Sequence, residues 1–136
     1  MKLLLYFFIF ISFSLSATAQ TIKDNAYSTS GYIKDDGRIQ NSSYQTVGYF
    51  KNDGRIQDAS YKTIGYIKDD GRIQNSSYQT VGYVKADGMV QNSSYQTLGY
   101  IKENGTVQNN SYQTLGYADG IKKEWAAAFF FFFEFE

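Results

Sequence analysis

Five consecutive copies of a 17-residue unit make up most of the chain, and this repeat limits what the chain can fold into. The first copy, GYIKDDGRIQNSSYQTV, covers residues 31–47, and the others follow without a gap at 48–64, 65–81, 82–98 and 99–115. A unit this short forms little more than a β-hairpin, so it buries apolar surface only against its neighbours. The repeat therefore predicts an all-β protein built from stacked or ringed hairpins.

The turn of each hairpin is best defined around Asp35-Asp36-Gly37 and its equivalents. A two-residue loop in the second copy would place Phe50 opposite Gln57. A three-residue loop closed by glycine in the left-handed conformation places Phe50 opposite Ile56, which keeps apolar side chains on one face. We therefore predict the three-residue loop in every copy, with positive φ at Gly37, Gly54, Gly71, Gly88 and Gly105.

The longer strand of each repeat is expected to alternate between two faces. Across the junction of the first and second copies we expect an extended run from Ser43 to Phe50, with Tyr44 and Phe50 on the buried face and Tyr49 on a half-exposed face. The buried face also carries one glycine per repeat. These glycines indicate a place where a backbone or an aromatic ring comes close: Gly31, Gly48, Gly65, Gly82, Gly99 and Gly116.

Residues 1–19 have the pattern of a secretory signal peptide. A lysine at position 2 precedes an apolar run, and Ala17-Thr18-Ala19 supplies small residues for cleavage before Gln20. The run is short for a retained membrane anchor, and no stop-transfer pattern follows it. We expect removal of residues 1–19, a periplasmic or secreted protein, and no stable membrane span afterwards.

Incomplete repeats flank the five full copies and predict a closed ring. Residues 21–30 form a half repeat, and residues 116–124 begin a further copy with two residues missing before its turn glycine. Half units at both ends suit a ring whose terminal strands pair with each other. We expect one domain over 20–136; the sequence leaves open whether the halves complete a fifth unit or add a sixth.

The aromatic tail, residues 125–136, matches no repeat. It contains six phenylalanines and the only tryptophan of the chain. Exposed to water, such a segment would be a large apolar patch, so we expect it to pack against the repeats. Its alternating end and its phenylalanines favour a strand over a helix. Docking of this tail to a partner is the alternative.

The leader, the 17-residue Gly-Tyr-Ile-Lys-x-x-Gly-x-Ile-Gln hairpins and the Ala-Ala-Ala-Phe-Phe-Phe tail together resemble the five-fold beta-flower proteins, which are small exported bacterial repeat proteins. This resemblance implies an all-β body with pseudo-five-fold symmetry and no established activity. A more distant likeness is to choline-binding repeats, but these build their cages from tryptophans, and here Trp125 lies outside the repeats.

The composition argues against most chemistry. The chain has no His and no Cys, which removes the usual nucleophile, base and zinc ligand types. The aspartates lie beside turn glycines, where Asp has backbone roles, and their spacing matches no established calcium loop. We therefore expect a protein that is no enzyme and has neither metal nor cofactor.

Without Lys2 there are 12 basic and 13 acidic residues, so nucleic acid is not an expected partner.

Tyrosine is the one repeated residue with binding potential. The candidate ligand-binding residues are those on the half-exposed face: Tyr32, Tyr49, Tyr66, Tyr83 and Tyr100. A tyrosine beside amide side chains can stack on a sugar or peptide and donate a hydrogen bond, although tyrosine is also an ordinary packing residue of sheets. The sequence favours an exported binding module for carbohydrate or a peptidoglycan-like ligand. The alternative is a structural or assembly protein, with another envelope protein as its partner.

Overall fold

A computed structural model of the protein describes residues 20–136, so the predicted signal peptide lies outside the described residues. Within this range, twelve short strands are followed by one turn and a half of α-helix and a π-helical turn. The elements are β1 (Gln20–Asp24), β2 (Thr29–Ile33), β3 (Arg38–Asn41), β4 (Thr46–Phe50), β5 (Arg55–Asp58), β6 (Thr63–Ile67), β7 (Arg72–Asn75), β8 (Thr80–Val84), β9 (Met89–Asn92), β10 (Thr97–Ile101), β11 (Thr106–Asn109), β12 (Thr114–Tyr117), α1 (Lys123–Ala127) and η1 (Ala128–Phe132).

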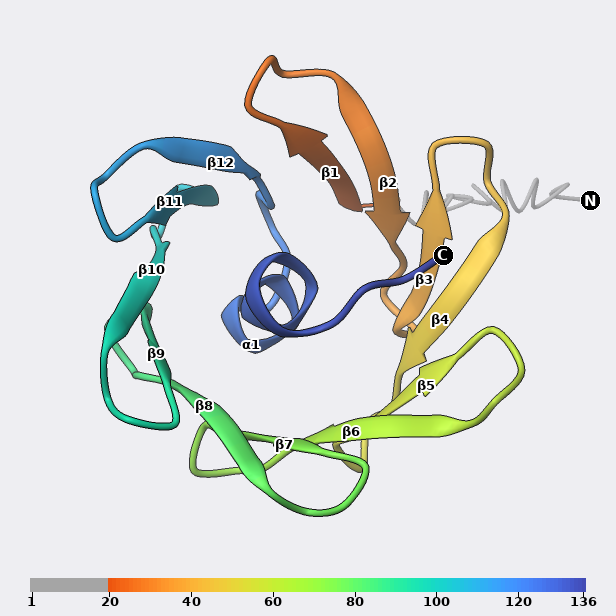
Figure 1. The fold of residues 1–136 in the computed structure, drawn as a ribbon. Coiled ribbons are helices and arrows are strands. Elements are labelled where there is room, and N and C mark those ends of the chain that lie inside the picture. Colours follow the sequence, from red (N-terminus) through yellow and green to blue (C-terminus); the bar gives the residue numbers. More distant parts are fainter. Residues whose placement is uncertain (1–19) are drawn as a thin grey trace, which may run out of the picture.

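The strands form one closed antiparallel ring around α1 (Figure 1). Each strand pairs with its neighbours in sequence, and β1 pairs with β12 to close the ring, with Lys23 opposite Tyr117 and Asp24 opposite Gly116. The predicted closed ring of hairpin repeats is confirmed. The terminal halves supply β1 and β12, so they add a sixth pair beside the five complete repeats.

Three-residue loops join β2 to β3, β4 to β5, and so on round the ring, as predicted. We call them glycine loops: 35–37, 52–54, 69–71, 86–88 and 103–105. Phe50 lies opposite Ile56, and the glycines have φ between 87° and 92°. The carbonyl of Gly54 accepts a hydrogen bond from the N–H of Ile67 at 2.7 Å. A Cβ on Gly54 would collide with the carbonyl oxygen of Ile67, so glycine is required both for φ and for this contact.

The inward face of the ring carries pairs of apolar side chains at the glycine-loop ends of the strands. The buried partners include Ile33 with Ile39, Phe50 with Ile56, and Val84 with Val90. Because every hairpin supplies such a pair, they line the interior of the ring at one level. This apolar lining is the surface that the rest of the chain fills.

The aromatic tail fills the ring, which confirms the predicted packing. Trp125 is buried and stacks on Phe50, the one phenylalanine of the repeats, with ring centroids 5.4 Å apart. Lys123 fixes the start of α1, since its Nζ donates to the carbonyl of Ala86 at 2.9 Å.

No helix within residues 20–136 has the length and apolar character needed to cross a membrane.

The preference for a strand in the tail was wrong: residues 123–132 are helical, and only the last residues are extended. The reason is hydrogen bonding. A closed ring has no free strand edge, so a segment inside it must satisfy its backbone N–H and C=O groups internally, which a helix does.

Successive phenylalanines of the tail contact successive repeats in reverse order. Cβ atoms placed on the inward glycines would meet a different ring each time: Phe130 at Gly116, Phe131 at Gly99, Phe132 at Gly82, Phe133 at Gly65 and Phe135 at Gly48. No tail ring is among the nearest contacts of Gly31. The predicted close approach of aromatic rings to the inward glycines is therefore confirmed, and the missing Cβ atoms make room for the rings.

Candidate functional site

A second set of three-residue loops lies at the opposite ends of the strands from the glycine loops. We call them tyrosine loops, because each ends in a tyrosine: 25–27, 42–44, 59–61, 76–78, 93–95 and 110–112. The two strands that a tyrosine loop joins are called a tyrosine hairpin, for example β3 with β4 and β7 with β8. Six such hairpins form the described ring.

The tyrosine loops have the same backbone as the glycine loops, with tyrosine in the glycine position. The N–H of Tyr44 donates to the carbonyl of Asn41, and the N–H of Asn41 donates to the carbonyl of Gln45, both at 3.0 Å. The corresponding bonds of a glycine loop join Gly54 to Lys51 and Lys51 to Arg55. All six loop tyrosines have φ between 63° and 66°, a left-handed conformation that costs a non-glycine residue about 1–2 kcal/mol.

An Asn or Asp side chain at the start of each tyrosine loop holds this conformation. In the loop after β3, the Oδ1 of Asn41 accepts from the N–H groups of Ser43 and Gln45, both at 3.0 Å, and its Nδ2 donates to the Oε1 of Gln45 at 2.9 Å. Asp24 and Asp58 accept the same pair of backbone bonds in their loops. The local sequence thus stabilises an otherwise unfavourable tyrosine backbone.

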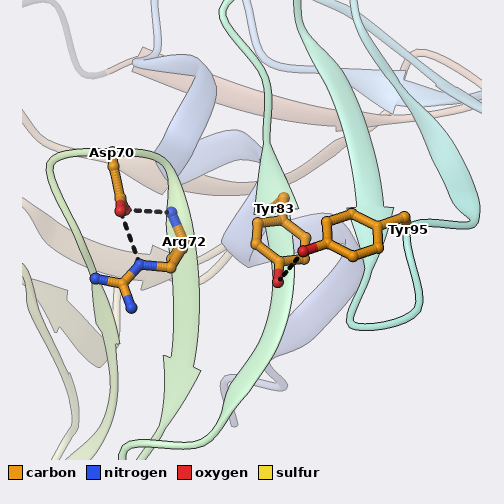
Figure 2. Close-up of polar contacts among 4 residues, drawn as sticks. All are labelled: Asp70, Arg72, Tyr83 and Tyr95. Atoms are coloured by element: carbon orange, nitrogen blue, oxygen red, sulfur yellow. Dashed lines mark hydrogen bonds and ion pairs between the residues drawn. The ribbon is translucent and has the colours of Figure 1, made fainter.

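Five of the six loop tyrosines stack on a strand tyrosine from the preceding tyrosine hairpin. Tyr95 of the loop after β9 lies on Tyr83 of β8, with ring centroids 4.8 Å apart and planes 13° from parallel (Figure 2). The hydroxyl of Tyr83 donates to the hydroxyl of Tyr95 at 3.3 Å. We call the five such pairs of the described chain the tyrosine stacks: Tyr32 with Tyr44, Tyr49 with Tyr61, Tyr66 with Tyr78, Tyr83 with Tyr95, and Tyr100 with Tyr112.

The pair that closes the ring differs from the other five. Tyr27 meets Tyr117 edge to face, with centroids 5.0 Å apart and planes at 79°. The ammonium of Lys23 lies over the Tyr27 ring, 3.6 Å from its centroid, where a cation is attracted to the aromatic face. A tyrosine pair therefore also joins the first and last tyrosine hairpins where the ring closes, but in a different geometry.

The loop tyrosines are the most exposed aromatic side chains of the described residues. Their exposed fractions run from 63% to 66%, whereas their partners on the strands are half-buried. The neighbouring loop side chains Ser42, Ser43 and Gln45 are also exposed. In the four loops that carry the Asn and Gln pair, after β3, β7, β9 and β11, the exposed ring thus lies beside hydroxyl and amide groups. The loop after β5 has Asp58 and Lys62 in their place.

Hydrogen bonding between the hydroxyls affects how the stacks titrate. The hydrogen bond to the partner tyrosine, followed by partial loss of hydration, raises the pKa of Tyr32, Tyr49, Tyr66, Tyr83 and Tyr100 above the usual value of 10.0. These phenols therefore stay neutral at neutral pH, where they can donate and accept hydrogen bonds.

A sequence profile of the 5-fold beta-flower protein family matches residues 19–134. The chain belongs to this family. No curated protein and no solved structure matches the chain. The membership confirms the resemblance drawn from the repeats and the tail.

The five tyrosines predicted as ligand-binding in this beta-flower protein, Tyr32, Tyr49, Tyr66, Tyr83 and Tyr100, all occupy the strand positions of the stacks. Sequence reasoning missed their exposed partners, because it continued the period-two alternation back through Tyr44 and placed that residue on the buried face. This placement was wrong: Tyr44 is 64% exposed, and β4 begins only at Thr46. The available signal was the equal spacing of Asn41 to Tyr44 and Lys34 to Gly37.

In this beta-flower protein, the aspartates directly before the loop glycines, Asp36, Asp53, Asp70 and Asp87, have the expected backbone role. The Oδ1 of Asp70 accepts from the N–H of Arg72 at 3.1 Å, and its Oδ2 pairs with the Nε of Arg72 at 2.8 Å (Figure 2). The backbone bond and the pairing with the arginine side chain hold the pKa of Asp70 below its usual value. Within residues 20–136 no three acidic side chains gather in a way that could hold a metal ion.

A hollow of about 230 Å³ lies at the glycine-loop end of the ring. Its lining includes Lys51, Lys68, Lys122 and Trp125. The ammonium of Lys122 lies 4.6 Å from the centroid of the Trp125 ring, which is itself only 7% exposed. The aromatic side chains are thus covered here, whereas they are open at the tyrosine loops.

Proposed function

We propose that this beta-flower protein is an exported, non-catalytic binding module of the periplasm or cell surface that recognises carbohydrate or peptidoglycan-like polymers with its tyrosine loops. The observation that carries the proposal is the exposed tyrosine in the left-handed position of every tyrosine loop. Glycine takes that position at the other end of the same strands, so the fold has a residue that fits the backbone without strain.

Stability alone gives little reason for tyrosine at these positions. The left-handed backbone costs about 1–2 kcal/mol, and an aromatic pair contributes about 0.5–1.5 kcal/mol beyond the area it buries. The two terms nearly cancel, and the outer ring keeps most of its surface in water. Unfavourable backbone conformations that persist in a fold often mark functional positions.

The chemistry of the tyrosine loops suits a sugar polymer. An exposed aromatic face can cover the apolar face of a pyranose ring, while the hydroxyl, serine and glutamine groups around it can exchange hydrogen bonds with sugar hydroxyls. Equivalent sites on several hairpins would let a polymer bind through several weak contacts, which raises its avidity. The strand tyrosines Tyr32, Tyr49, Tyr66, Tyr83 and Tyr100 would support the exposed rings from below.

The alternative, a structural or assembly role with the aromatic tail docked to a partner, has less support. The rings of Phe130 to Phe133 already lie against inward glycines of the same chain. Releasing them would expose that surface to water and empty the ring.

A glycan array and sedimentation with insoluble polysaccharides, including peptidoglycan, test the proposal. The wild-type chain is compared with a variant in which Tyr44, Tyr61, Tyr78 and Tyr95 are replaced by glycine, which keeps the loop backbone and removes the rings. The matched control replaces Lys51 and Lys68 by alanine at the other end of the ring. We expect binding that the glycine variant loses by at least tenfold and the control keeps. Absence of binding to every polymer, or equal binding by both variants, would overturn the proposal.

A further inference from the structure

We propose that the five tyrosine stacks are sites of oxidative cross-linking, at which hydrogen peroxide and a one-electron oxidant of the peroxidase type join the two rings as dityrosine. This inference is independent of carbohydrate binding. It concerns the same tyrosines, but as reactants in an oxidation and not as a binding surface, and it requires no bound carbohydrate.

The geometry of the stacks places the reacting atoms next to each other. Dityrosine is joined through the ring carbons ortho to the two hydroxyls. In the stacks the ring centroids lie 4.7 to 5.1 Å apart and the planes are within 15° of parallel. Hydroxyl oxygens lie 3.1 Å apart in the pair Tyr32 and Tyr44, and 3.4 Å apart in the pair Tyr100 and Tyr112. Rings aligned in this way have their ortho carbons side by side.

The reaction balances with peroxide as the electron acceptor. Each phenol loses one electron and one proton to give a phenoxyl radical, and the two radicals form a carbon–carbon bond between ortho positions. The two ring hydrogens then shift to the oxygens, which restores both hydroxyls and both aromatic rings. The protein loses two hydrogens in total, and one hydrogen peroxide takes up the two electrons and two protons to become two waters.

Access and competition favour the stacks. The loop tyrosine of each pair is about two-thirds exposed, so an oxidant can reach it. The chain has no cysteine, and Trp125 is buried inside the ring. Met89 is half-buried, and its oxidation to the sulfoxide adds an oxygen to the chain, so the intact mass distinguishes it from a link between tyrosines. Each cross-link would join residues 12 apart in sequence that belong to neighbouring tyrosine hairpins. Tyrosine pairs would thereby supply covalent links in a chain that cannot form disulfides.

The closing pair serves as an internal control. The ring centroids of Tyr27 and Tyr117 are as close as those of the stacked pairs, but the ring planes are nearly perpendicular. The ammonium of Lys23 lies over the Tyr27 ring, and the two rings do not share the alignment that brings the hydroxyls of Tyr83 and Tyr95 together. The distance between the ring centroids is therefore similar in the closing pair and the tyrosine stacks, whereas the angle between the ring planes differs. If alignment controls coupling, this pair should remain unlinked.

The experiment treats the dilute, folded protein with a haem peroxidase and hydrogen peroxide. Dityrosine fluorescence, intact mass and mapping of linked peptides are recorded. We expect monomers that have lost two hydrogens per link, with links between Tyr32 and Tyr44 and between the four equivalent pairs. Replacing Tyr95 by phenylalanine should remove one of the five links and about a fifth of the fluorescence, whereas Tyr27→Phe should change neither.

The same treatment in denaturant provides the reference for chance coupling. There we expect the pairing to become unselective and partly intermolecular. The proposal is overturned if the folded protein forms no dityrosine, if its links are mainly between molecules, if Tyr27 couples to Tyr117 as readily as Tyr95 to Tyr83, or if folded and unfolded chains give the same linked peptides.

Discussion

Phe135 lies against the backbone of Gly48, so close that a Cβ on this glycine would be 2.7 Å from the Cδ1 of the phenylalanine ring and 2.8 Å from the carbonyl oxygen of Gln57. The contact joins the extended C-terminal end of the chain to the second repeat. A substitution at residue 48 therefore tests directly whether the Phe135 ring packs at this position.

Replacing Gly48 by alanine should therefore destabilise the fold by about 2 kcal/mol or more, because both the ring and a strand backbone must move. Gly31→Ala is the matched control: its Cβ meets the carbonyl of Gln40 at 2.5 Å, but no tail ring. Chemical denaturation of both variants measures the difference. Because the backbone clash at Gly31 is at least as close as that at Gly48, Gly48→Ala is also measured with Phe135→Ala. If Gly48→Ala costs the same with and without the Phe135 ring, Phe135 does not occupy this position.

Gly71→Val should destabilise the protein by about 2–3 kcal/mol, since valine is strongly disfavoured at a φ of 88° and its Cβ would collide with the carbonyl oxygen of Val84. The N–H of Val84, which donates to the carbonyl of Gly71 at 2.8 Å, would be displaced as well. The melting temperature gives the readout, with Asp69→Ala in the same loop as the control. A melting temperature equal to that of the control would contradict the assigned loop.

At Tyr78, glycine should be better tolerated than alanine. Tyr78→Gly loses the stack on Tyr66 but relieves the left-handed backbone, so its unfolding free energy should stay within about 1 kcal/mol of the wild type. Tyr78→Ala loses the stack and keeps the unfavourable conformation, so it should be about 1 kcal/mol less stable than the glycine variant. If alanine matched glycine, the loop would not require positive φ.

Deleting residues 126–136 should leave a ring that melts far lower or aggregates. The deletion removes the buried Ala126–Ala128 and six phenylalanines that are half-buried against the core. A fully buried phenylalanine contributes roughly 1.5–3 kcal/mol, and each of the six contributes a part of this. Removing the exposed Glu136 alone is the control and should change little. Light scattering and thermal unfolding distinguish the cases; a soluble, monomeric truncation with an unchanged melting temperature would show that the tail is not core.

Alkaline pH should weaken the tyrosine stacks. The folded-state pKa of Tyr83 lies above the ordinary value of 10.0, because its hydroxyl is bonded to that of Tyr95. A raised folded pKa contributes stability below the unfolded pKa, and this contribution is lost as pH rises through the folded pKa. Stability should thus fall above about pH 10. Tyr95→Phe should lower the pKa of Tyr83 in an ultraviolet absorbance titration, and an unchanged pKa would contradict the assigned hydrogen bond.

Local patterns predicted the glycine loops correctly, because the pairing of Phe50 with Ile56 and the need for glycine at residue 54 both depend on a few adjacent residues. Ring closure followed from the matching half repeats at the two ends. The identity of the closing pair, Lys23 with Tyr117, depended on the number of strands that fit the ring, and no single repeat contains that information.

Long-range structure explains where sequence reasoning failed. Phenylalanine prefers strands locally, yet residues 128–132 are helical because the closed ring offers them no strand to pair with. Tyr44 breaks the strand alternation because Asn41 stabilises a loop that usually contains glycine. Its stacking partner Tyr32 comes from a different hairpin, so the pair became visible only in three dimensions.

Five tail phenylalanines lie at five of the six inward glycines, and this match couples the number of repeats to the length of the tail. A chain that duplicated one 17-residue unit would gain an inward glycine without gaining a ring to cover it, and the widened ring would enclose an unfilled space. A chain that lost a unit would have one phenylalanine too many for its interior. We therefore expect a change in the number of repeats to require a matching change in the phenylalanines of the aromatic tail.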